Sequence, residues 1–347
     1  MREALVGSIL KKYRLQKGIT EDELAQLLGI WNRYVPLWEE GLALPDAHLL
    51  PLLVEILRIP APESEEVLQP KPVLNFDREE LVIPGLEKEY TLLHLSDNHA
   101  IMVDYNDTLE RIRYEERRIS ADFYEDGVMI NDRLEACWDY IAENKDALDG
   151  VLFTGDVIDC PFEPMIDYLI EKLQALPVPY MYTLGNHDWQ HFDEHDGMAN
   201  RARLPRFAPI TGGDPDIHVK HIGELTLIGL NNTLDCYPEG VADRLEQLLK
   251  TEKNVLILQH GPFCSPTLTP ANKLWWMGSD ITIGAAGDER HDNRRVLEMI
   301  TAPDSPVKAV IVGHIHFHHR DLLNGRVPQF SVQHGAHGGG TLYHIHG

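Results

Sequence analysis

The sequence predicts an α/β fold in which two β-sheets pack together between layers of helices (αββα), preceded by a small all-α domain. Three observations predict it. Helical periodicity runs through the first 59 residues, strand and helix patterns alternate from residue 90, and the last part of the chain is rich in strand patterns. Sheets of this kind place ligand sites in the loops at the carboxyl ends of their strands.

The composition is that of a globular protein with a strong acidic excess. The chain has 347 residues, 43% hydrophobic and 25% charged, and a formal net charge of −24. This charge argues against broad binding to nucleic-acid backbones, whereas bound divalent ions would still permit a phosphate-bearing substrate. We find no signal peptide, no stretch of membrane-helix length and no paired cysteine spacing, so we expect a cytoplasmic protein without membrane contact.

Residues 1–59 predict a module of four or five short helices. Thr20 is followed three residues later by Glu23, which is a capping box before an apolar helix face. Gly29 supplies a turn, and the next helical pattern covers residues 30–40.

This module resembles the helix-turn-helix domain of phage-repressor type over residues 5–59. The residues that carry the resemblance are 10–20, Glu23, Leu24, Ala25, Leu28, Gly29, Trp38, Glu39 and Gly41. The resemblance implies that the helix after Gly29 enters the DNA major groove. However, Pro36 falls inside that predicted helix, where an interior proline costs about 3 kcal/mol. The module also has seven basic against eight acidic residues, so a docking or homodimerisation module is favoured slightly over one that reads DNA.

Residues 60–89 predict a linker, because prolines interrupt an acidic stretch of low periodicity. These are Pro60, Pro62, Pro70, Pro72 and Pro84. Residues 81–83 are expected to add an edge strand to the domain that follows. The predicted organisation is therefore 1–59, linker 60–89, and a larger domain over 90–347.

The larger domain is expected to contain nine strands and at least three helices. The predicted strands are 90–96, 151–154, 178–184, 217–221, 225–230, 255–259, 309–312, 329–332 and 341–345. Apolar residues at helical spacing mark helices around 134–141, 166–173 and 245–249.

Polar side chains follow five of these strands directly. The segments are Asp97-Asn98-His99, Gly155-Asp156 with Asp159, Gly185-Asn186-His187-Asp188, His260, and Gly313-His314-Ile315-His316. A buried carboxylate is costly unless it is paired or bound to metal. Five strand ends that deliver oxygen and nitrogen ligands predict a dinuclear metal centre.

In this order the five segments resemble the motifs of the calcineurin-like metallophosphoesterases. The resemblance implies metal-dependent hydrolysis of a small phosphate ester by two divalent ions, with a hydroxide bridging them. The residue types suit Mn, Fe or Zn. The implied ligands are Asp97, His99 and His316 for one metal, Asn186, His260 and His314 for the other, and Asp156 as the bridge.

The resemblance implies a catalytic role for His187 that does not involve binding metal. His187 is expected to act as general acid toward the leaving oxygen, or to stabilise the charge on that oxygen. It needs an orienting partner, for which the resemblance implies Asp159, with Asp188 as a second candidate.

The substrate branch is indicated by two departures from the Ser/Thr phosphatases of the family. Those enzymes carry Arg and Glu at the positions held here by Cys160 and Asp188. The usual bidentate arginine clamp on a phosphomonoester is therefore missing, which favours phosphodiesters.

Two stretches, 101–127 and 262–292, extend a minimal domain. Their aromatic residues, including Trp275 and Trp276, either cap the site and stack a flat group or pack the insert onto the sheet. An alternative function for the whole chain is a DNA-binding regulator whose phosphoesterase domain senses a ligand. A metal-free descendant is disfavoured, because the full ligand set is present.

Overall fold

The computed structural model describes residues 2–46, 49–68, 72–104, 106–119, 128–191, 201–282 and 291–347. The chain divides into two compact units. One comprises residues 1–72 with 116–132, and the other comprises residues 73–115 with 133–347.

The first unit is a bundle of short helices around one apolar core. Its helices are α1 (Arg2–Lys17), α2 (Glu21–Leu28), α3 (Tyr34–Glu39), α4 (Leu49–Leu57) and α5 (Glu63–Val67). Leu10, Leu24, Trp38 and Leu53 are among the buried residues of this core. The capping box of Thr20 and Glu23 is confirmed, because each side chain bonds the backbone N–H of the other residue.

The helix predicted over residues 30–40 begins later than expected. Helix α3 starts at Tyr34, so Pro36 is its third residue. The first N–H groups of a helix have no intrahelical partner, and a proline there removes no hydrogen bond. The expected cost of an interior proline is therefore not incurred, and the helix that follows the turn forms.

A buried ion pair ties α1 to α3 in this unit. Glu39 accepts from Arg14 through both carboxylate oxygens, and the Nη2–Oε2 distance is 2.8 Å.

We expect Glu39→Ala to lower the free energy of unfolding of the module, measured with urea, by about 3–5 kcal/mol. The reason is that the buried Arg14 guanidinium then loses its main charge partner. The matched control is Glu21→Ala, which removes a more exposed carboxylate 3.5 Å from the same arginine and should cost less than about 1 kcal/mol. Equal effects of the two variants would contradict this account.

The second unit contains two β-sheets. The first has the strand order β1-β11-β2-β3-β4, and the second has the order β5-β6-β7-β8-β10-β9. The strands are β1 (Asn75–Val82), β2 (Tyr90–Leu95), β3 (Gly150–Phe153), β4 (Tyr180–Tyr182), β5 (Ile217–Ile222), β6 (Leu225–Leu230), β7 (Val255–Gln259), β8 (Val307–Val312), β9 (His319–Leu323), β10 (Val327–Ser331) and β11 (Gly339–His346).

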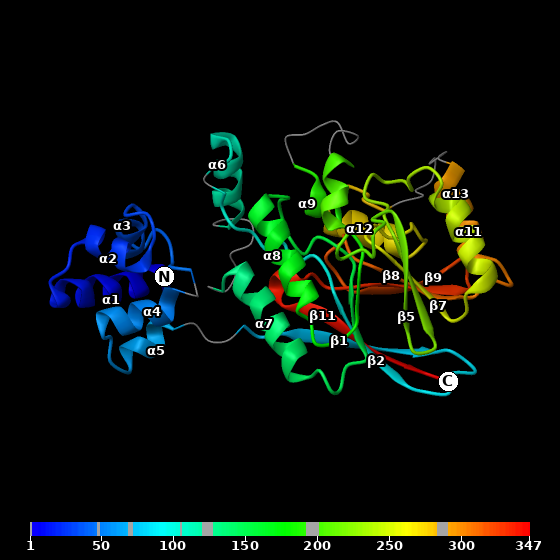
Figure 1. Ribbon diagram of the computed structural model, residues 1–347, viewed down its shortest axis with the longest axis horizontal. Helices are drawn as coiled ribbons and strands as arrows, with labels where there is room; N and C mark the ends of the chain where they lie inside the picture. The colour runs from blue at the N-terminus through cyan, green and yellow to red at the C-terminus, as the bar shows by residue number, and fades with distance from the viewer. Residues whose placement is uncertain are drawn as a thin grey trace. The chain divides into compact units, whose positions relative to one another are not determined.

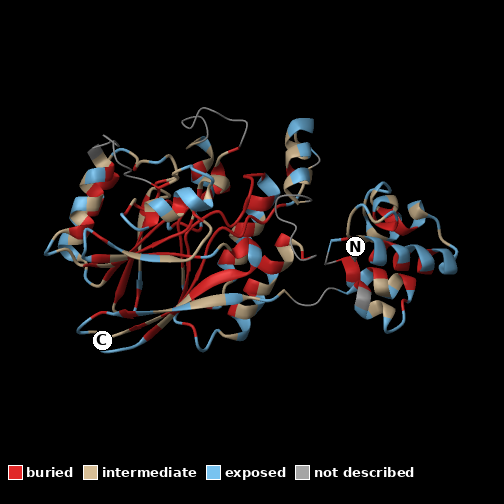
Figure 2. Cartoon of the chain, turned by 180° about the vertical axis from the view of Figure 1, so that it is seen from behind, coloured by how far each residue is buried: buried red, intermediate tan, exposed pale blue. Residues whose placement is uncertain are grey.

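The two sheets face each other across an apolar layer and carry helices on their outer faces (Figure 1). Residues such as Leu152, Leu258 and Tyr343 fill the space between the sheets. Helices α7 (Ile130–Glu143) and α8 (Glu163–Gln174) contribute to the core on the outside of the first sheet. Helices α11 (Val241–Thr251) and α13 (His291–Thr301) do so for the second sheet. The buried strands stand out in Figure 2, and the predicted αββα fold is confirmed.

Shorter helices lie in the loops between these elements. They are α6 (Leu109–Arg117), α9 (Asn186–Trp189), α12 (Leu268–Trp275), and the 3₁₀ segments η2 (Arg201–Phe207) and η3 (Gly335–His337). Among the residues that the structure describes, no helix combines the length and the apolar character needed to cross a membrane.

Three elements, α5, β1 and β9, differ wholly or in part from the sequence expectation. The stretch predicted as a linker contains α5 and β1, and β1 pairs in parallel with β11 at the edge of the first sheet, as expected for residues 81–83. Strand β9 was not expected, because its sequence His-Arg-Asp-Leu-Leu is polar. It forms because β10 pairs with it as an antiparallel partner.

Candidate metal centre

The loops that follow five strands meet at one end of the two sheets. Backbone hydrogen bonds join these loops: Asp97 N donates to Gly155 O at 3.0 Å, and Gly313 N donates to His260 O at 3.0 Å. His314 N donates to the Asp97 carboxylate at 2.9 Å. The candidate residues, which lie far apart in the sequence, are therefore brought together.

One group of possible metal ligands consists of Asp97, His99 and His316. Their ligand atoms all lie within 4.8 Å of one another. The two imidazole Nε2 atoms are 3.2 Å apart, and His316 Nε2 is 3.3 Å from Asp97 Oδ1. Asp97 and His99 are buried, whereas His316 is partly exposed at the rim.

A second group consists of Asp156, His260 and His314. His260 Nε2 is 3.0 Å from Asp156 Oδ2 and 3.0 Å from His314 Nδ1. Asn186 begins helix α9 and is half-buried; the residue before it, Gly185, lies against the Asp156 carboxylate. A third group, of His99, Asp156 and His187, overlaps the first two groups.

The donor set fits divalent transition metals. Ligands bound to one such ion at about 2.0–2.2 Å lie roughly 3 Å apart, which is the spacing of the facing nitrogen and oxygen atoms here. His99 Nδ1 is held by Asp159 Oδ1 at 2.8 Å, and His260 Nδ1 by Thr154 O at 2.6 Å. These bonds fix the rings so that each Nε2 faces the cluster, as in metal-binding histidines generally.

Charges within the cluster shift the pKa values of its members. Burial opposes the charged form of His260, but Asp156 and Asp97 outweigh it and raise its pKa to about 9. Burial and then the charge of His260 lower the pKa of His314 to about 3. Burial favours neutral Asp97 and Asp156, yet the surrounding histidines hold the pKa of both carboxyls below the usual value. The carboxylates are therefore ionised at neutral pH, which is the state that binds metal.

The backbone at this site is strained. Five of the candidate ligands have left-handed φ values: 53° at Asp97, 49° at His99, 51° at Asp156, 71° at His314 and 66° at His316. This conformation is unfavourable for residues with a Cβ and costs on the order of 1–3 kcal/mol at each position. Such strain is typical of functional sites, where it aims side chains that an ordinary loop would direct elsewhere.

Close packing of the loops explains two of the glycines in the motifs. A Cβ at position 185 would lie 2.1 Å from Asp156 Oδ1, and one at position 313 would lie 2.6 Å from Asp97 Oδ2. Any side chain at either glycine would therefore displace a candidate ligand.

The two candidate partners of His187 differ: Asp159 lies beside its imidazole, whereas Asp188 binds backbone groups. The His187 Nδ1 atom is 3.3 Å from Asp159 Oδ1 and 3.0 Å from Asp159 O. Asp188 instead accepts backbone N–H groups of Gly185, Asp156 and Ile158, so it joins the β3 and β4 loops. Burial, and then the charge of Asp156, raises the pKa of Asp188 to about 7.

His334 is a residue of this site that the sequence did not suggest. Its ring stacks on that of His316 with centroids 4.8 Å apart and an interplanar angle of 9°. Burial lowers the pKa of His334 to about 2. The other candidate histidines were identified because they directly follow a strand. His334 follows β10 by three residues, so the same signal could have identified it.

Trp275 and Trp276 form an aromatic rim beside the cluster. Trp276 meets the His316 ring at 5.2 Å, and Trp275 packs on Phe317 at 5.4 Å while its side chain stays exposed. Trp276 thus contacts the site, and Trp275 both packs and faces solvent. Residues 105, 120–127 and 283–290, which belong to the two predicted insertions, lie outside the described residues.

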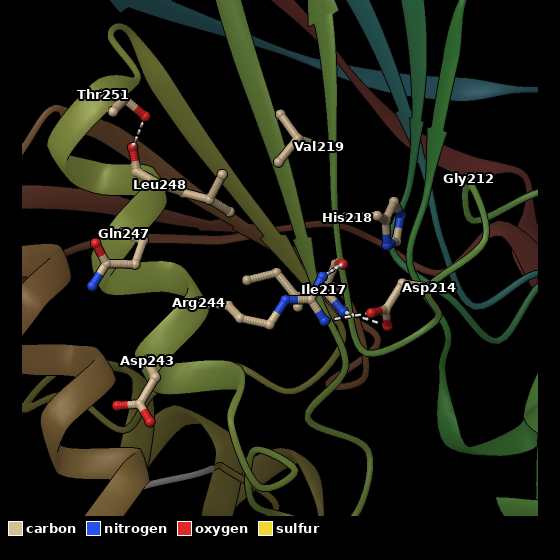
Figure 3. Close-up of a pocket in the computed structure, with 10 residues that line it drawn as sticks. All are labelled: Gly212, Asp214, Ile217, His218, Val219, Asp243, Arg244, Gln247, Leu248 and Thr251. Atoms are coloured by element: carbon tan, nitrogen blue, oxygen red, sulfur yellow. Dashed lines mark hydrogen bonds and ion pairs between the residues drawn. The ribbon is translucent and has the colours of Figure 1, made fainter.

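A separate cavity of about 740 Å³ lies between β5 and α11 (Figure 3). Arg244 points across it to pair with Asp214 and also donates to Ile217 O. None of the candidate metal or catalytic residues lines this cavity. Because Arg244 already has partners within the protein, we assign no catalytic or metal-binding role to this cavity.

Comparison with known proteins identifies two families. The model of the calcineurin-like phosphoesterases matches residues 90–318, and that of the helix-turn-helix domains matches residues 10–64. No curated protein matches the chain.

Three solved structures show a general similarity to the chain. One is a dimetal phosphatase from Danio rerio, with 16% identity, coverage of 72% of this chain and 88% of that chain, and a TM-score of 0.42. Another is a purple acid phosphatase from yellow lupin seeds, with 15% identity, coverage of 74% and 45%, and a TM-score of 0.44. A third is a phosphopantetheinyl hydrolase from Mycobacterium tuberculosis, with 14% identity, coverage of 72% and 91%, and a TM-score of 0.37.

The family match spans most of the larger unit and includes every strand end that contributes to the ligand cluster. The chain therefore belongs to the calcineurin-like phosphoesterases and is a metal-dependent phosphoesterase that also carries a helix-turn-helix domain.

Proposed function

We propose that the chain hydrolyses phosphodiesters at a centre of two divalent metal ions. The observation that carries this proposal is the overlap of three ligand groups, in which Asp156 and His99 are each shared by two groups. A shared carboxylate is the arrangement that holds two cations close together.

The residues of this centre take the following roles in the proposal. Asp97, His99 and His316 hold one ion, Asn186, His260 and His314 hold the other, and Asp156 binds both. The two ions, of Mn, Fe or Zn, supply an activated water and neutralise charge on the phosphoryl group.

In the proposal His187 protonates the leaving oxygen of the ester. Its side chain is 29% exposed at the rim of the cluster, so a bound ester can reach it. Asp159 lies beside Nδ1, at 3.0 Å through its backbone oxygen and 3.3 Å through Oδ1, which leaves Nε2 as the nitrogen that carries the proton to the ester.

Preference for a diester is supported by the apolar surface beside the centre. Leu274, Trp275 and Met277 are 85%, 55% and 97% exposed, and they adjoin Trp276, which contacts His316. A diester carries a second organic group, which such a surface can cover, whereas a monoester dianion is better served by an arginine clamp. The equivalent position here holds the buried Cys160.

Replacing Trp275 by alanine tests this preference. We expect the variant to raise KM for a bis-aryl phosphodiester about tenfold, the loss of roughly 1.4 kcal/mol of contact, with kcat little changed. KM for the matching aryl monoester should change less. The proposal of diester preference is wrong if the unaltered protein, supplied with Mn²⁺, hydrolyses the monoester faster than the diester.

A second candidate function is DNA-binding regulation by the helix-turn-helix domain. It is favoured by one observation: Pro36 lies in the first turn of α3, so the helix after the turn is intact. The segment before it exposes Trp31 and Arg33. Binding to duplex DNA from the neighbourhood of its own gene, with a salt dependence that weakens in Arg33→Ala, would support this function. Absence of binding at low salt would favour the alternative of a docking or homodimerisation module.

A further inference from the structure

A second group of metal-binding side chains lies at the far end of β11. His344 and His346 are two residues apart on this strand, so their side chains share one face of the sheet. Glu80 of β1 is paired in register with His344 and joins them on that face. The group is distant from the metal centre: Thr341, which pairs with His94 of β2, precedes His346 by five residues, or about 17 Å of strand. Figure 1 shows β11 running to the marked C-terminus at this end.

The distances within this group already approach those of a bound metal. His346 Nε2 is 3.1 Å from Glu80 Oε2, and the ligand atoms of Glu80, His344 and His346 all lie within 4.8 Å of one another. Two ligands of a tetrahedral zinc ion with bonds of about 2.1 Å are separated by about 3.4 Å, so small side-chain rotations suffice. His346 Nδ1 faces Gly347 O at 3.2 Å, which orients the ring with Nε2 toward the glutamate.

A fourth ligand is within reach. Glu89 precedes β2, and its Oε2 atom is 3.8 Å from His344 Nε2. The four side chains are partly or largely exposed, so an ion can reach them without opening the fold.

We propose that Glu80, His344 and His346, with Glu89 or water as the fourth ligand, bind one zinc-type divalent ion. Two imidazoles with one or two carboxylates suit zinc, copper or nickel and not calcium or magnesium, which prefer oxygen ligands. The ion links β1 to β11 and so fastens the edge strand to the sheet. Because it binds the folded protein, it stabilises this edge in proportion to the logarithm of free zinc concentration.

The proposal depends on the second histidine, and another surface pair provides the control. His221 of β5 is 2.9 Å from Glu252, so it has a carboxylate partner, but no described histidine completes a ligand group with it. A single histidine and one carboxylate bind zinc only weakly, whereas the β11 group chelates it.

The test is equilibrium dialysis of the full chain against micromolar free Zn²⁺, followed by measurement of bound zinc per chain. We expect the double variant His344→Ala, His346→Ala to bind one ion fewer than the unaltered protein, and His221→Ala to bind the same number. Glu80→Gln, which keeps the side-chain shape, should weaken this binding at least tenfold. Zinc should also raise the melting temperature of the unaltered protein more than that of the double variant.

Equal zinc content in the unaltered protein and the double variant would overturn the proposal. Mn²⁺-dependent hydrolysis is expected to be unchanged in the double variant, because neither histidine belongs to the catalytic centre. This readout shows that the variant is folded and separates the outcome from that of the proposed diesterase activity.

Discussion

Replacing Asp156 by asparagine is expected to lower kcat/KM for a phosphodiester about 10³-fold or more, a loss at the upper end of those seen when one stabilising group is removed from an active site. The carboxylate is buried, lies 3.0 Å from His260 Nε2 and accepts from His187 N at 2.7 Å. Asparagine keeps the shape but removes the negative charge that, in the proposed centre, binds both ions. The steady-state rate with saturating Mn²⁺ measures the effect.

A matched variant separates this effect from a general change of charge. Asp243→Asn alters an exposed aspartate that pairs with Arg295 on the outer helices, and it should leave the rate unchanged. If Asp156→Asn retains the activity of the unaltered protein, Asp156 does not bind the catalytic metals.

The second large effect is expected for His187→Ala. We expect kcat to fall about 10²–10⁴-fold for a diester with a poor, alkoxide-like leaving group, because the departing oxygen then receives no proton. A nitrophenolate leaves without protonation, so the loss should be much smaller with a nitrophenyl diester. Comparing the two substrates in the same variant measures the contribution of the proton.

The comparison also distinguishes two roles for His187. This residue lies within ligand distance of His99 and Asp156, as well as beside Asp159. If His187 were a metal ligand, replacing it would slow hydrolysis of both substrates equally. The variant would also lose bound metal. Equal losses with the two leaving groups would therefore contradict the role of general acid.

The ligand cluster was predictable because its signal is local in the sequence. Each predicted residue follows an apolar run, and strand ends of one sheet edge are brought together by the fold itself. The histidines and carboxylates at residues 97–99, 156, 260 and 314–316 were selected in this way, whereas Asp159 was implied by the family resemblance; the structure places these side chains close together.

Other features depend on contacts between distant segments and left no such signal. Strand β9 is polar and forms only through its partner β10. The sequence indicated an edge strand at residues 81–83, but not its parallel pairing with β11, which joins the two ends of the larger unit. The role of Asp188 was also not evident, because it binds backbone groups of another loop and not a neighbouring side chain. The left-handed backbone of five candidate ligands occurs at residues other than glycine, so their type did not indicate it.

The most direct test of the dinuclear centre is the number of Mn²⁺ ions bound per chain. The measurement is best made by elemental analysis of the His344→Ala, His346→Ala variant after dialysis against Mn²⁺, since this variant removes the separate site that we propose on β11. The account predicts two ions per chain, falling to one or none when Asp156→Asn is added. A single ion, or none, in the variant with an intact Asp156 would contradict a centre that holds two metals.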